Sequence, residues 1–325
     1  MICLMAIVAL IALAGCTPKN AEPVKFSSFD YFDTVTDVTV YGADEAEIAR
    51  IYHAVYGRLH HVFDAFYPHT GVNGVYQLNR AGGEWAAVEP ELLDLLLLCR
   101  DWQEVADATD VTQGALFRLW HAFRSEGGDL PTDAALEEAA RHGGWALVEI
   151  DEENARVRLN DPNAALDLGA VAKGYAAGKL GEAIEGAGYQ TYIIDAGGNV
   201  VAGYRERPFV VGVTDPINGG MLMRLSMNNL AAVTSGDYQR YREYEGVRYH
   251  HIVDTKTLRP ADTGIRQVTV IHADSGFADY LSTSLFLMDY ESGRAFCEDQ
   301  GIDAIWLLEG GAVEMTEGAR GLAVD

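Results

Sequence analysis

Hydrophobic and polar residues recur with two periods along the chain, and these periods predict strands and helices. Residues 31 to 42, YFDTVTDVTVYG, mix threonine with valine and end at glycine, which predicts a strand. From 45 to 66, apolar residues recur every three or four positions, so we expect a long helix that packs one apolar face on a sheet. A second helix is predicted over 89 to 108, and a third within PTDAALEEAARHGG at 131 to 144, which has a threonine N-cap signal and a glycine stop.

Short strands dominate the pattern after Gly144. VEIDEENARVRLN predicts a hairpin, and ALDLGAVAKGYAAG at 165 to 178 predicts a strand to Leu168, a turn at Gly169 and a helix from about Ala170. The remaining predicted strands and the last helix lie in YIIDAGGNVVAGY, PFVVGVTD, AAVTSGDYQRYREYEGVRYHHIVD, QVTVIHADSGFADYLSTSLFLMDY and the closing hairpin AIWLLEGGAVEMT. We therefore expect a mixed α/β (α+β) fold with mostly antiparallel sheets packed with helices. Because no segment within 26 to 325 has linker composition, this range is predicted to be a single domain with two lobes.

Composition changes this picture in one respect. The 325 residues are 49% hydrophobic, enough for a full core, but the formal net charge is −24. Such a surface argues against nucleic acid or anionic lipid as a partner of the whole molecule. An anionic ligand would need a locally electropositive pocket.

The N-terminal sixteen residues, MICLMAIVALIALAGC, predict a secretory signal, because the apolar run is short for a membrane span and ends in small residues. Leu13-Ala14-Gly15-Cys16 resembles a bacterial lipobox, which would make Cys16 the lipidated residue and 17 to 25 a polar tether. The alternative is a buried N-terminal helix. Cys99 and Cys297 are expected to be unrelated core thiols, since no Cys/His metal spacing is present.

One acid and one lysine, Asp167 and Lys173, interrupt the small apolar residues of ALDLGAVAKGYAAG. The free amides and positive dipole end of a helix start attract phosphate, and Lys173 could reach the same anion. Alternatively, the two charged residues pair with each other and the glycines only allow close packing. The glycines of DAGGN at 195 to 199 and TSGDY at 234 to 238 are similarly ambiguous between plain turns and phosphate contacts.

Two further segments carry candidate chemistry. Adjacent strand residues face opposite ways, so His250 and His251 cannot both line one pocket; one is expected to be structural, and the other could accept a proton. In ADYLSTSLF, Asp279 and Thr283 lie four apart on one helical face and offer hard oxygen ligands suited to Mg²⁺. The alternative is an ordinary helix acid and a threonine that bonds to its own turn.

Taken together and in order, these segments resemble the ApbE family of flavin transferases. The similarity runs from about 30 to 290, through DTVTDVTVYG, VFDAFYP, LNR, TQGALF, ALDLGAVAKGYAAG, YIIDAGGN, VTSGDYQRY, YHHIVD and ADYLSTSLF. The resemblance implies an exported, magnesium-dependent enzyme that takes FAD, releases AMP and joins FMN to a threonine or serine of a membrane redox subunit, such as one of an Rnf- or Nqr-like complex. It implies a protein anchored by lipid on the outer face of the cytoplasmic membrane.

The resemblance also implies roles for individual residues. Asp279 and Thr283, with the carbonyl of Ala170, would hold Mg²⁺, and His251 would assist the acceptor hydroxyl together with Asp279. The residues implied to contact FAD are Phe32, Phe66, Ala115, Leu116, Phe117, Asp167, Lys173 and Ile252.

Several segments depart from the family pattern. Phe32-Asp33-Thr34 stands where methionine-glycine-threonine is usual, HTGVNGVYQLN replaces an acidic stretch with serine, and DTKTLRP replaces DPxTGxP. The family aspartate that follows the turn at 115–117 is replaced by Arg118 or is absent, depending on the alignment. Two alternatives to FMN transfer therefore stay open: hydrolysis of FAD to FMN and AMP without an acceptor, and binding of FAD without turnover.

Overall fold

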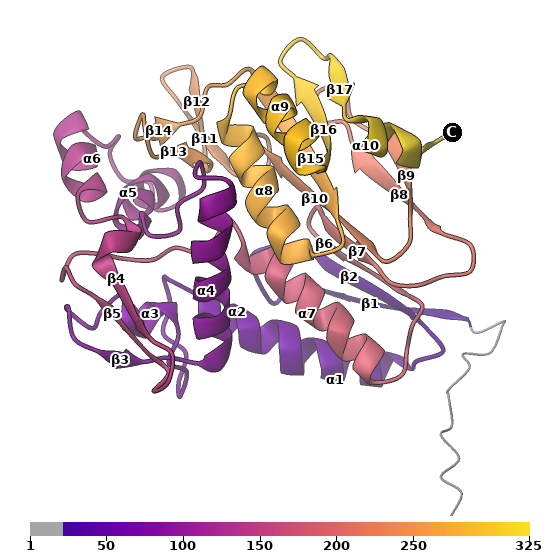
Figure 1. The fold of residues 1–325 in the computed structure, drawn as a ribbon, viewed down its shortest axis with the longest axis horizontal. Coiled ribbons are helices and arrows are strands. Elements are labelled where there is room, and N and C mark those ends of the chain that lie inside the picture. Colours follow the sequence, from indigo (N-terminus) through magenta and orange to yellow (C-terminus); the bar gives the residue numbers. More distant parts are fainter. Residues whose placement is uncertain (1–21) are drawn as a thin grey trace, which may run out of the picture.

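Eight strands form the central sheet of the computed structural model, which describes residues 22–325 (Figure 1). Every pairing between neighbours in this sheet is antiparallel. In spatial order the strands are β1 (Pro23–Ser28), β2 (Thr36–Tyr41), β6 (Tyr192–Ala196), β7 (Asn199–Ala202), β10 (Leu230–Gly236), β15 (Ile265–His272), β16 (Asp303–Leu308) and β17 (Val313–Met315).

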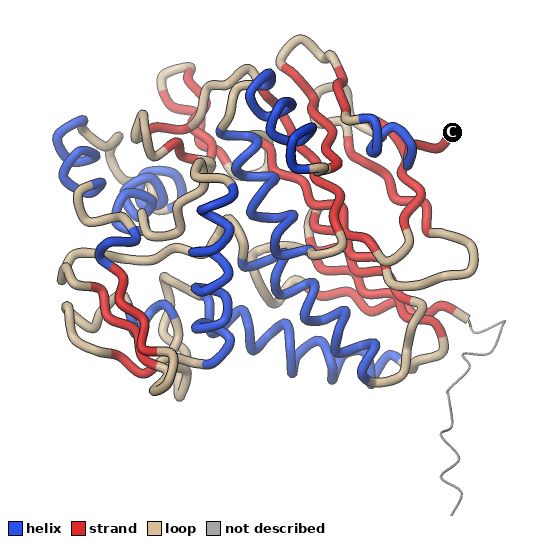
Figure 2. Tube along the Cα trace, viewed as in Figure 1, coloured by secondary structure: helices blue, strands red, loops and turns tan. Residues whose placement is uncertain are grey.

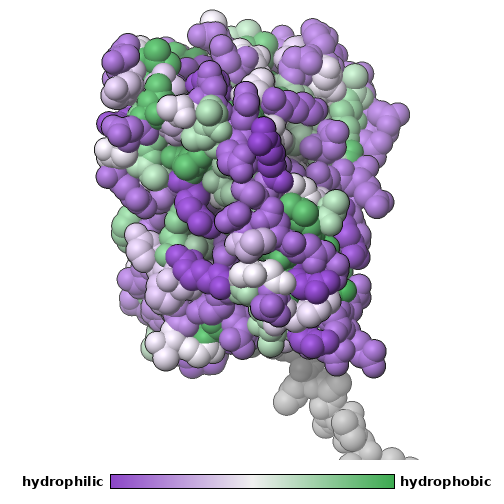
Figure 3. Space-filling view, turned by 90° about the vertical axis from the view of Figure 1, so that its left-hand side faces the viewer, coloured by the Kyte–Doolittle hydropathy of each residue, from purple (hydrophilic) through white to green (hydrophobic). Residues whose placement is uncertain are grey.

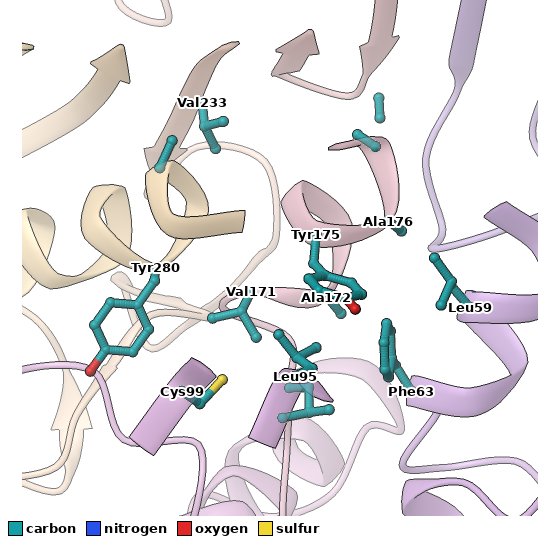
Figure 4. Close-up of a cluster of buried hydrophobic side chains, with 14 of the residues drawn as sticks. Leu59, Phe63, Leu95, Cys99, Val171, Ala172, Tyr175, Ala176, Val233 and Tyr280 are labelled. Carbon is teal, nitrogen blue, oxygen red and sulfur yellow. The ribbon is translucent and has the colours of Figure 1, made fainter. Parts of the chain in front are cut away.

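Helices cover one face of this sheet (Figure 2). They are α1 (Glu45–Tyr52), a π-helical turn (His53–Gly57), α2 (Arg58–Phe63), α7 (Ala172–Gly186) and α8 (Ser275–Leu287), with α4 (Pro90–Val105) packed beside them. Figure 4 shows side chains from α2, α4, α7, α8 and β10 converging on one buried cluster. Tyr175 of α7 lies near its middle, between Phe63 and Val171. The helix that carries Lys173 is thus anchored on several sides.

A smaller sheet covers the opposite face. It consists of β8 (Phe209–Thr214), β9 (Met221–Met227) and β18 (Ala323–Val324). The short helix α10 (Glu317–Leu322) directly precedes β18 in the chain. Central strands serve both cores by alternation: Val233 and Val270 face the helices, whereas Ala232 and Ile271 face the smaller sheet.

Short helices and strands form the second lobe of the molecule. These are α3 (Val75–Leu78), β3 (Ala86–Ala87), α5 (Gly114–Ser125), α6 (Asp133–Ala140), a 3₁₀ turn (Trp145–Leu147), β4 (Val148–Asp151), β5 (Arg156–Leu159), and the hairpins β11 (Tyr241–Tyr244) with β12 (Val247–His250) and β13 (Val253–Asp254) with β14 (Arg259–Pro260). Figure 3 shows the face of the molecule at this end, where hydrophobic side chains occur in small separate groups among hydrophilic ones. The fold prediction, mixed α/β with mostly antiparallel sheets, is confirmed.

Some element boundaries were predicted wrongly. The strand expected over 31 to 42 begins only at Thr36, because Phe32 and Asp33 adopt positive φ in a turn. The helix expected over 45 to 66 ends at Phe63 and includes a π-helical turn. Helix α9 (Tyr290–Gln300), with the cap residue Gly301, precedes the closing hairpin and confirms the prediction that Cys297 lies in a helix.

The stretch 165 to 178 also differs from its prediction. Residues 166 to 168 form no strand, Ala165 makes a single parallel bridge to Gln113, and α7 starts at Ala172. At the N-terminus, β1 already begins at Pro23, inside the segment predicted to be a tether. The signal segment and Cys16 lie outside the described residues.

Two further features concern the helices and the cysteines of the described residues. Among residues 22–325, no helix has the length and hydrophobicity needed to cross a bilayer. Cys99 and Cys297 are free and buried, so the prediction of two unrelated core thiols is confirmed.

Candidate active site

Three of the sequence motifs are fastened together by backbone-directed hydrogen bonds. The Asn79 side chain donates to the Leu166 carbonyl and accepts from the Leu166 amide, both at 2.8 Å. The Asp167 amide donates to the Val111 carbonyl at 2.9 Å. Gly114, which opens α5, donates its amide to Ala165 at 2.9 Å, and a Cβ there would lie 2.6 Å from the Ala165 oxygen. LNR, TQGALF and the 165–178 stretch therefore meet at one place.

The crossing of α7 and α8 brings Lys173 and Asp279 together. The Gly174 amide donates to Asp279 Oδ2 at 2.7 Å. A Cβ on Gly174 would lie 2.4 Å from the Ser275 carbonyl oxygen and 2.5 Å from Asp279 Cβ, so only glycine allows this approach. Lys173 Nζ lies 3.3 Å from Asn199 Oδ1, at the start of β7. Lys173 bonds to Asn199 instead of forming the alternative pair with Asp167.

Burial disfavours the charged form of each of these groups. It raises the pKa of the Asp279 and Asp167 carboxyls and lowers the pKa of the Lys173 ammonium; the charge of Lys173 partly opposes the shift at Asp279. Asp279 is 4% exposed, whereas Asp167 and Lys173 stay half-buried and reach solvent. Clustered groups with shifted pKa values are typical of functional sites.

The predicted metal ligands offer hard oxygen donors. Asp279 Oδ2 already accepts from Gly174, which fixes the carboxylate and leaves Oδ1 without that bond. Thr283 lies one helical turn further along α8, and its hydroxyl is 3.2 Å from Ser235 Oγ at the end of β10. Ala170 belongs to the turn just before α7. A carboxylate, a hydroxyl and a backbone carbonyl suit Mg²⁺ in chemical type.

The idea that free amides at the helix start hold phosphate is wrong for most of this turn. The amides of Val171 and Ala172 donate to the Leu168 carbonyl, Tyr175 donates to Val171, and Gly174 donates to Asp279. The interpretation of DAGGN as a plain turn is also favoured, because the Gly198 amide donates to Asp195 Oδ1 at 3.2 Å. Charge for an anion must therefore come mainly from side chains.

The two adjacent histidines have different surroundings, as predicted. His250 Nε2 lies 2.9 Å from the Ala261 carbonyl, and its Nδ1 accepts from the Ile252 amide, so this ring is structural. His251 is half-buried, and its Nδ1 is buried without a hydrogen-bond partner. Burial, with the nearby charges of Arg240 and Arg124, holds the pKa of His251 well below its usual range. A neutral imidazole with a free nitrogen can accept a proton.

Of the residues predicted to contact flavin, Phe66 lies after α2, and Ala115, Leu116 and Phe117 lie at the start of α5. Phe66 follows α2 and stacks on His121 of α5, with ring centroids 4.1 Å apart. Ala115 and Phe117, in the first turn of α5, are half-buried. Leu116 between them is fully buried in the α5–α6 core, so its backbone is the part left for a ligand. His121 was missed by the sequence analysis, although its α5 position one turn after Phe117 could have indicated it.

Two other predicted flavin contacts are held by protein partners. The Phe32 amide donates to His60 Nδ1 at 3.3 Å, and its carbonyl accepts from Arg240 at 2.9 Å. Ile252 is 6% exposed and packs in the main core. Contact of Phe32 or Ile252 with flavin stays a prediction.

Two arginines near the site, Arg240 and Arg124, were not predicted from the sequence. The charge of Arg240 acts on the pKa values of Asp167, Lys173, His251 and Asp279, and Arg124 acts on those of Asp167 and His251. With Lys173 they form a local cationic group on a chain of net charge −24. Arg240 lies within the motif VTSGDYQRY, so the sequence could have indicated it as a site residue.

The described part also contains a cavity that none of these residues lines. It measures about 760 Å³ and is lined by the second half of α7, β7 and residues 273–276. Its charged lining includes Glu182, Glu185 and Asp274, with Lys179 as its one cation. Because these carboxylates would repel an anion, we assign the candidate active site to the group around Lys173, His251 and Asp279.

Comparison with known proteins identifies the family of this chain. The model of the ApbE family matches residues 32–306. A FAD:protein FMN transferase of Klebsiella pneumoniae is 29% identical over 83% of this chain and 84% of its own length. Proteins of the same name from Treponema pallidum and Rhodobacter capsulatus are each 30% identical; the matches cover 63% and 93% of this chain, and 62% and 59% of those relatives.

Solved structures agree with this match. The ApbE protein of Thermotoga maritima superposes with a TM-score of 0.85 at 30% identity, covering 94% of this chain and 100% of that one. The flavin transferase ApbE of Vibrio cholerae, at 22% identity, has a TM-score of 0.82 and shows the shared fold. The matched segment, 32–306, contains all the site residues described above. This chain belongs to the ApbE family.

Proposed function

We propose that this chain transfers FMN from FAD to a threonine or serine hydroxyl of an acceptor protein, releasing AMP, with Mg²⁺ as its metal. Family membership and the relatives named FAD:protein FMN transferase bear out the prediction of a flavin transferase enzyme. The observation that carries the proposal is the junction of α7 and α8, where the Gly174 amide binds Asp279 and the neighbouring Lys173 lies 3.3 Å from Asn199. The charge of Lys173 acts on the pKa of both Asp279 and His251.

The reaction forms one phosphoester bond and breaks one phosphoanhydride bond. The acceptor oxygen attacks the phosphorus of the FMN half, and the bond to the AMP phosphate breaks. His251, neutral at pH 7, accepts the hydroxyl proton through its free nitrogen. Lys173, Arg124 and Arg240 attract the pyrophosphate and stabilise the negative charge that leaves with AMP.

The donor set at α8 fits a magnesium ion. Asp279, Thr283 and the Ala170 carbonyl would hold it, and when bound it would neutralise charge on the pyrophosphate. Phe66, Phe117 and the backbone of Ala115 and Leu116 are the proposed flavin contacts. Phe66 already stacks on His121, so its opposite face is the one available for an isoalloxazine ring.

The proposal also includes the location of the enzyme in the cell and the protein that accepts FMN. We infer that Cys16 carries a lipid and holds the enzyme on the outer face of the cytoplasmic membrane. There the acceptor would be a subunit of an Rnf- or Nqr-like redox complex. The lipobox-like sequence supports the anchor, and the family resemblance supports the acceptor.

The decisive experiment incubates the purified chain with FAD, Mg²⁺ and a threonine-containing acceptor peptide, and measures peptide mass and AMP. We expect the peptide to gain the mass of an FMN phosphoester as AMP appears in equal amount. AMP and free FMN with an unmodified peptide would identify an FAD hydrolase instead. FAD that survives unchanged would mean binding without turnover.

A further inference from the structure

A histidine cluster lies at the end of α2 and shares no residue with the site proposed for FMN transfer. His60 in α2, Asp64 at its C-terminal cap and His69 in the following loop each offer a ligand atom, and these atoms all lie within 4.8 Å of one another. His69 Nε2 is 2.9 Å from Asp64 Oδ2. Three side chains from ten residues of chain therefore converge on one point.

The carboxylate is held in position by the backbone. Asp64 Oδ1 accepts from the amides of Phe66 at 2.8 Å and Tyr67 at 3.0 Å, so Oδ2 is the oxygen that faces the histidines. The Asp64 side chain is 7% exposed and that of His69 is 22% exposed. Backbone bonds of this kind orient a metal ligand before the ion arrives. The partial exposure of His69 leaves a path from solvent.

From this geometry we propose that His60, Asp64 and His69 bind a divalent transition-metal ion of the Zn²⁺ class. Two imidazoles and one carboxylate are ligands that such ions prefer, and a water would complete a four-coordinate site. Mg²⁺ prefers oxygen donors, which the Asp279 and Thr283 pair provides. The two sites differ in donor type, so they select different metals.

Ion binding exchanges weak contacts for stronger ones. His60 Nδ1 now accepts the Phe32 amide at 3.3 Å, which is long for such a bond. This bond is lost whichever nitrogen of His60 binds the metal, because Nδ1 then carries either the proton or the ion. The loss of this one long hydrogen bond is small beside the coordination of an ion by three protein ligands.

The ring of His61 stacks on that of His69, with the two centroids 4.1 Å apart, so His69 is held in place beside the cluster. Asp64 also accepts a hydrogen bond from the amide of Phe66. The proposed metal site therefore adjoins Phe66, one of the proposed flavin contacts.

The test measures metal content in the presence of competing Mg²⁺. The purified full-length chain is stripped with chelator, dialysed against Zn²⁺ with a large excess of Mg²⁺, and analysed for zinc. We expect one more Zn²⁺ per chain in the wild type than in His69→Gln or His60→Gln. Zn²⁺ should also raise the thermal midpoint of the wild type and not that of these variants.

His142→Gln is the matched control. His142 is likewise paired with a carboxylate, Asp161, at 2.6 Å, but it lies outside the cluster, so its variant should keep the zinc of the wild type. Circular dichroism checks that each variant is folded. Equal zinc in wild type, His60→Gln and His69→Gln would overturn the proposal, as would absence of zinc from the wild type.

Discussion

At the scale of single residues, the charge of Asp279 decides whether a cation can be held. Replacing Asp279 by asparagine keeps an acceptor for the Gly174 amide but removes the charge. We expect the rate of AMP release to fall about 10²-fold or more, because metal stabilisation of the transition state is worth several kcal/mol. The measurement is AMP formed from FAD at saturating Mg²⁺.

Asp299→Asn provides the control for this substitution. Asp299 is exposed on α9, and its recorded side-chain bond is to the neighbouring Gln300. Its variant should release AMP at the rate of the wild type. An unchanged rate in Asp279→Asn would reject the metal assignment.

His251 gives a prediction about pH. Its pKa in the folded protein is lowered below 6.5, so the unfolded chain takes up this proton at a higher pH than the folded chain. Its contribution to the free energy of unfolding is therefore present above pH 6.5 and is lost as pH falls through the folded pKa, by about 1.4 kcal/mol per pKa unit. Urea unfolding at several pH values should show wild type losing stability relative to His251→Gln on acidification.

The same substitution separates catalysis from stability. If His251 accepts the acceptor proton, His251→Gln should lower the rate of peptide flavinylation about 10²-fold or more. At neutral pH its thermal midpoint should stay close to that of the wild type, since a charged imidazole is absent from both. A variant that transfers FMN at full rate would assign the proton to another group.

At the scale of elements, the crossing of α7 and α8 creates the site, and Gly174 makes that crossing possible. Gly174→Ala would place a Cβ against the Ser275 carbonyl, and we expect a loss of about 1–3 kcal/mol in the free energy of unfolding. Gly178, one turn later, is the control: a Cβ there would lie at an ordinary 3.6 Å from Ser275 Cβ. Gly178→Ala should be neutral or stabilising by up to about 1 kcal/mol. Equal effects at both positions would contradict this account of the packing.

Periodicity predicted most elements because their own residues specify them. The apolar face of α1 and α2 and the alternation of β10 and β15 are visible in the sequence. The strand expected before Leu168 did not form, because its backbone partners come from elsewhere: Asn79 bonds Leu166 on both sides, and Val111 accepts the Asp167 amide. The local pattern of hydrophobic and polar residues does not indicate which distant residues supply these hydrogen-bond partners.

At the scale of the whole molecule, a chain of net charge −24 binds an anion only where its cations gather. FAD with Mg²⁺, without acceptor, should raise the thermal midpoint; at 100 times Kd the gain is about 2.7 kcal/mol. Lys173→Met should weaken FAD binding at least tenfold and so remove about 1.4 kcal/mol of that gain.

Lys179→Met is the control on the same helix. Lys179 is half-exposed and pairs with Glu182 at 2.9 Å, away from Asp279. Its variant should keep the full FAD-induced rise in thermal midpoint. A rise in Lys173→Met equal to that of the wild type would show that the pyrophosphate lies elsewhere.

By itself, the sequence determined the fold class, the family resemblance and the chemical types of Asp279, Thr283, Lys173 and His251, since motif order and periodicity are local properties. Only the tertiary structure decided which backbone and side-chain groups remain free to bind a ligand. It bonded the amides of the α7 start within the protein, turned Leu116 inward, and brought Arg240 near enough for its charge to lower the pKa of Lys173. Burial, hydrogen-bond partners and neighbouring charges depend on segments far apart in the chain, and only folding brings these together.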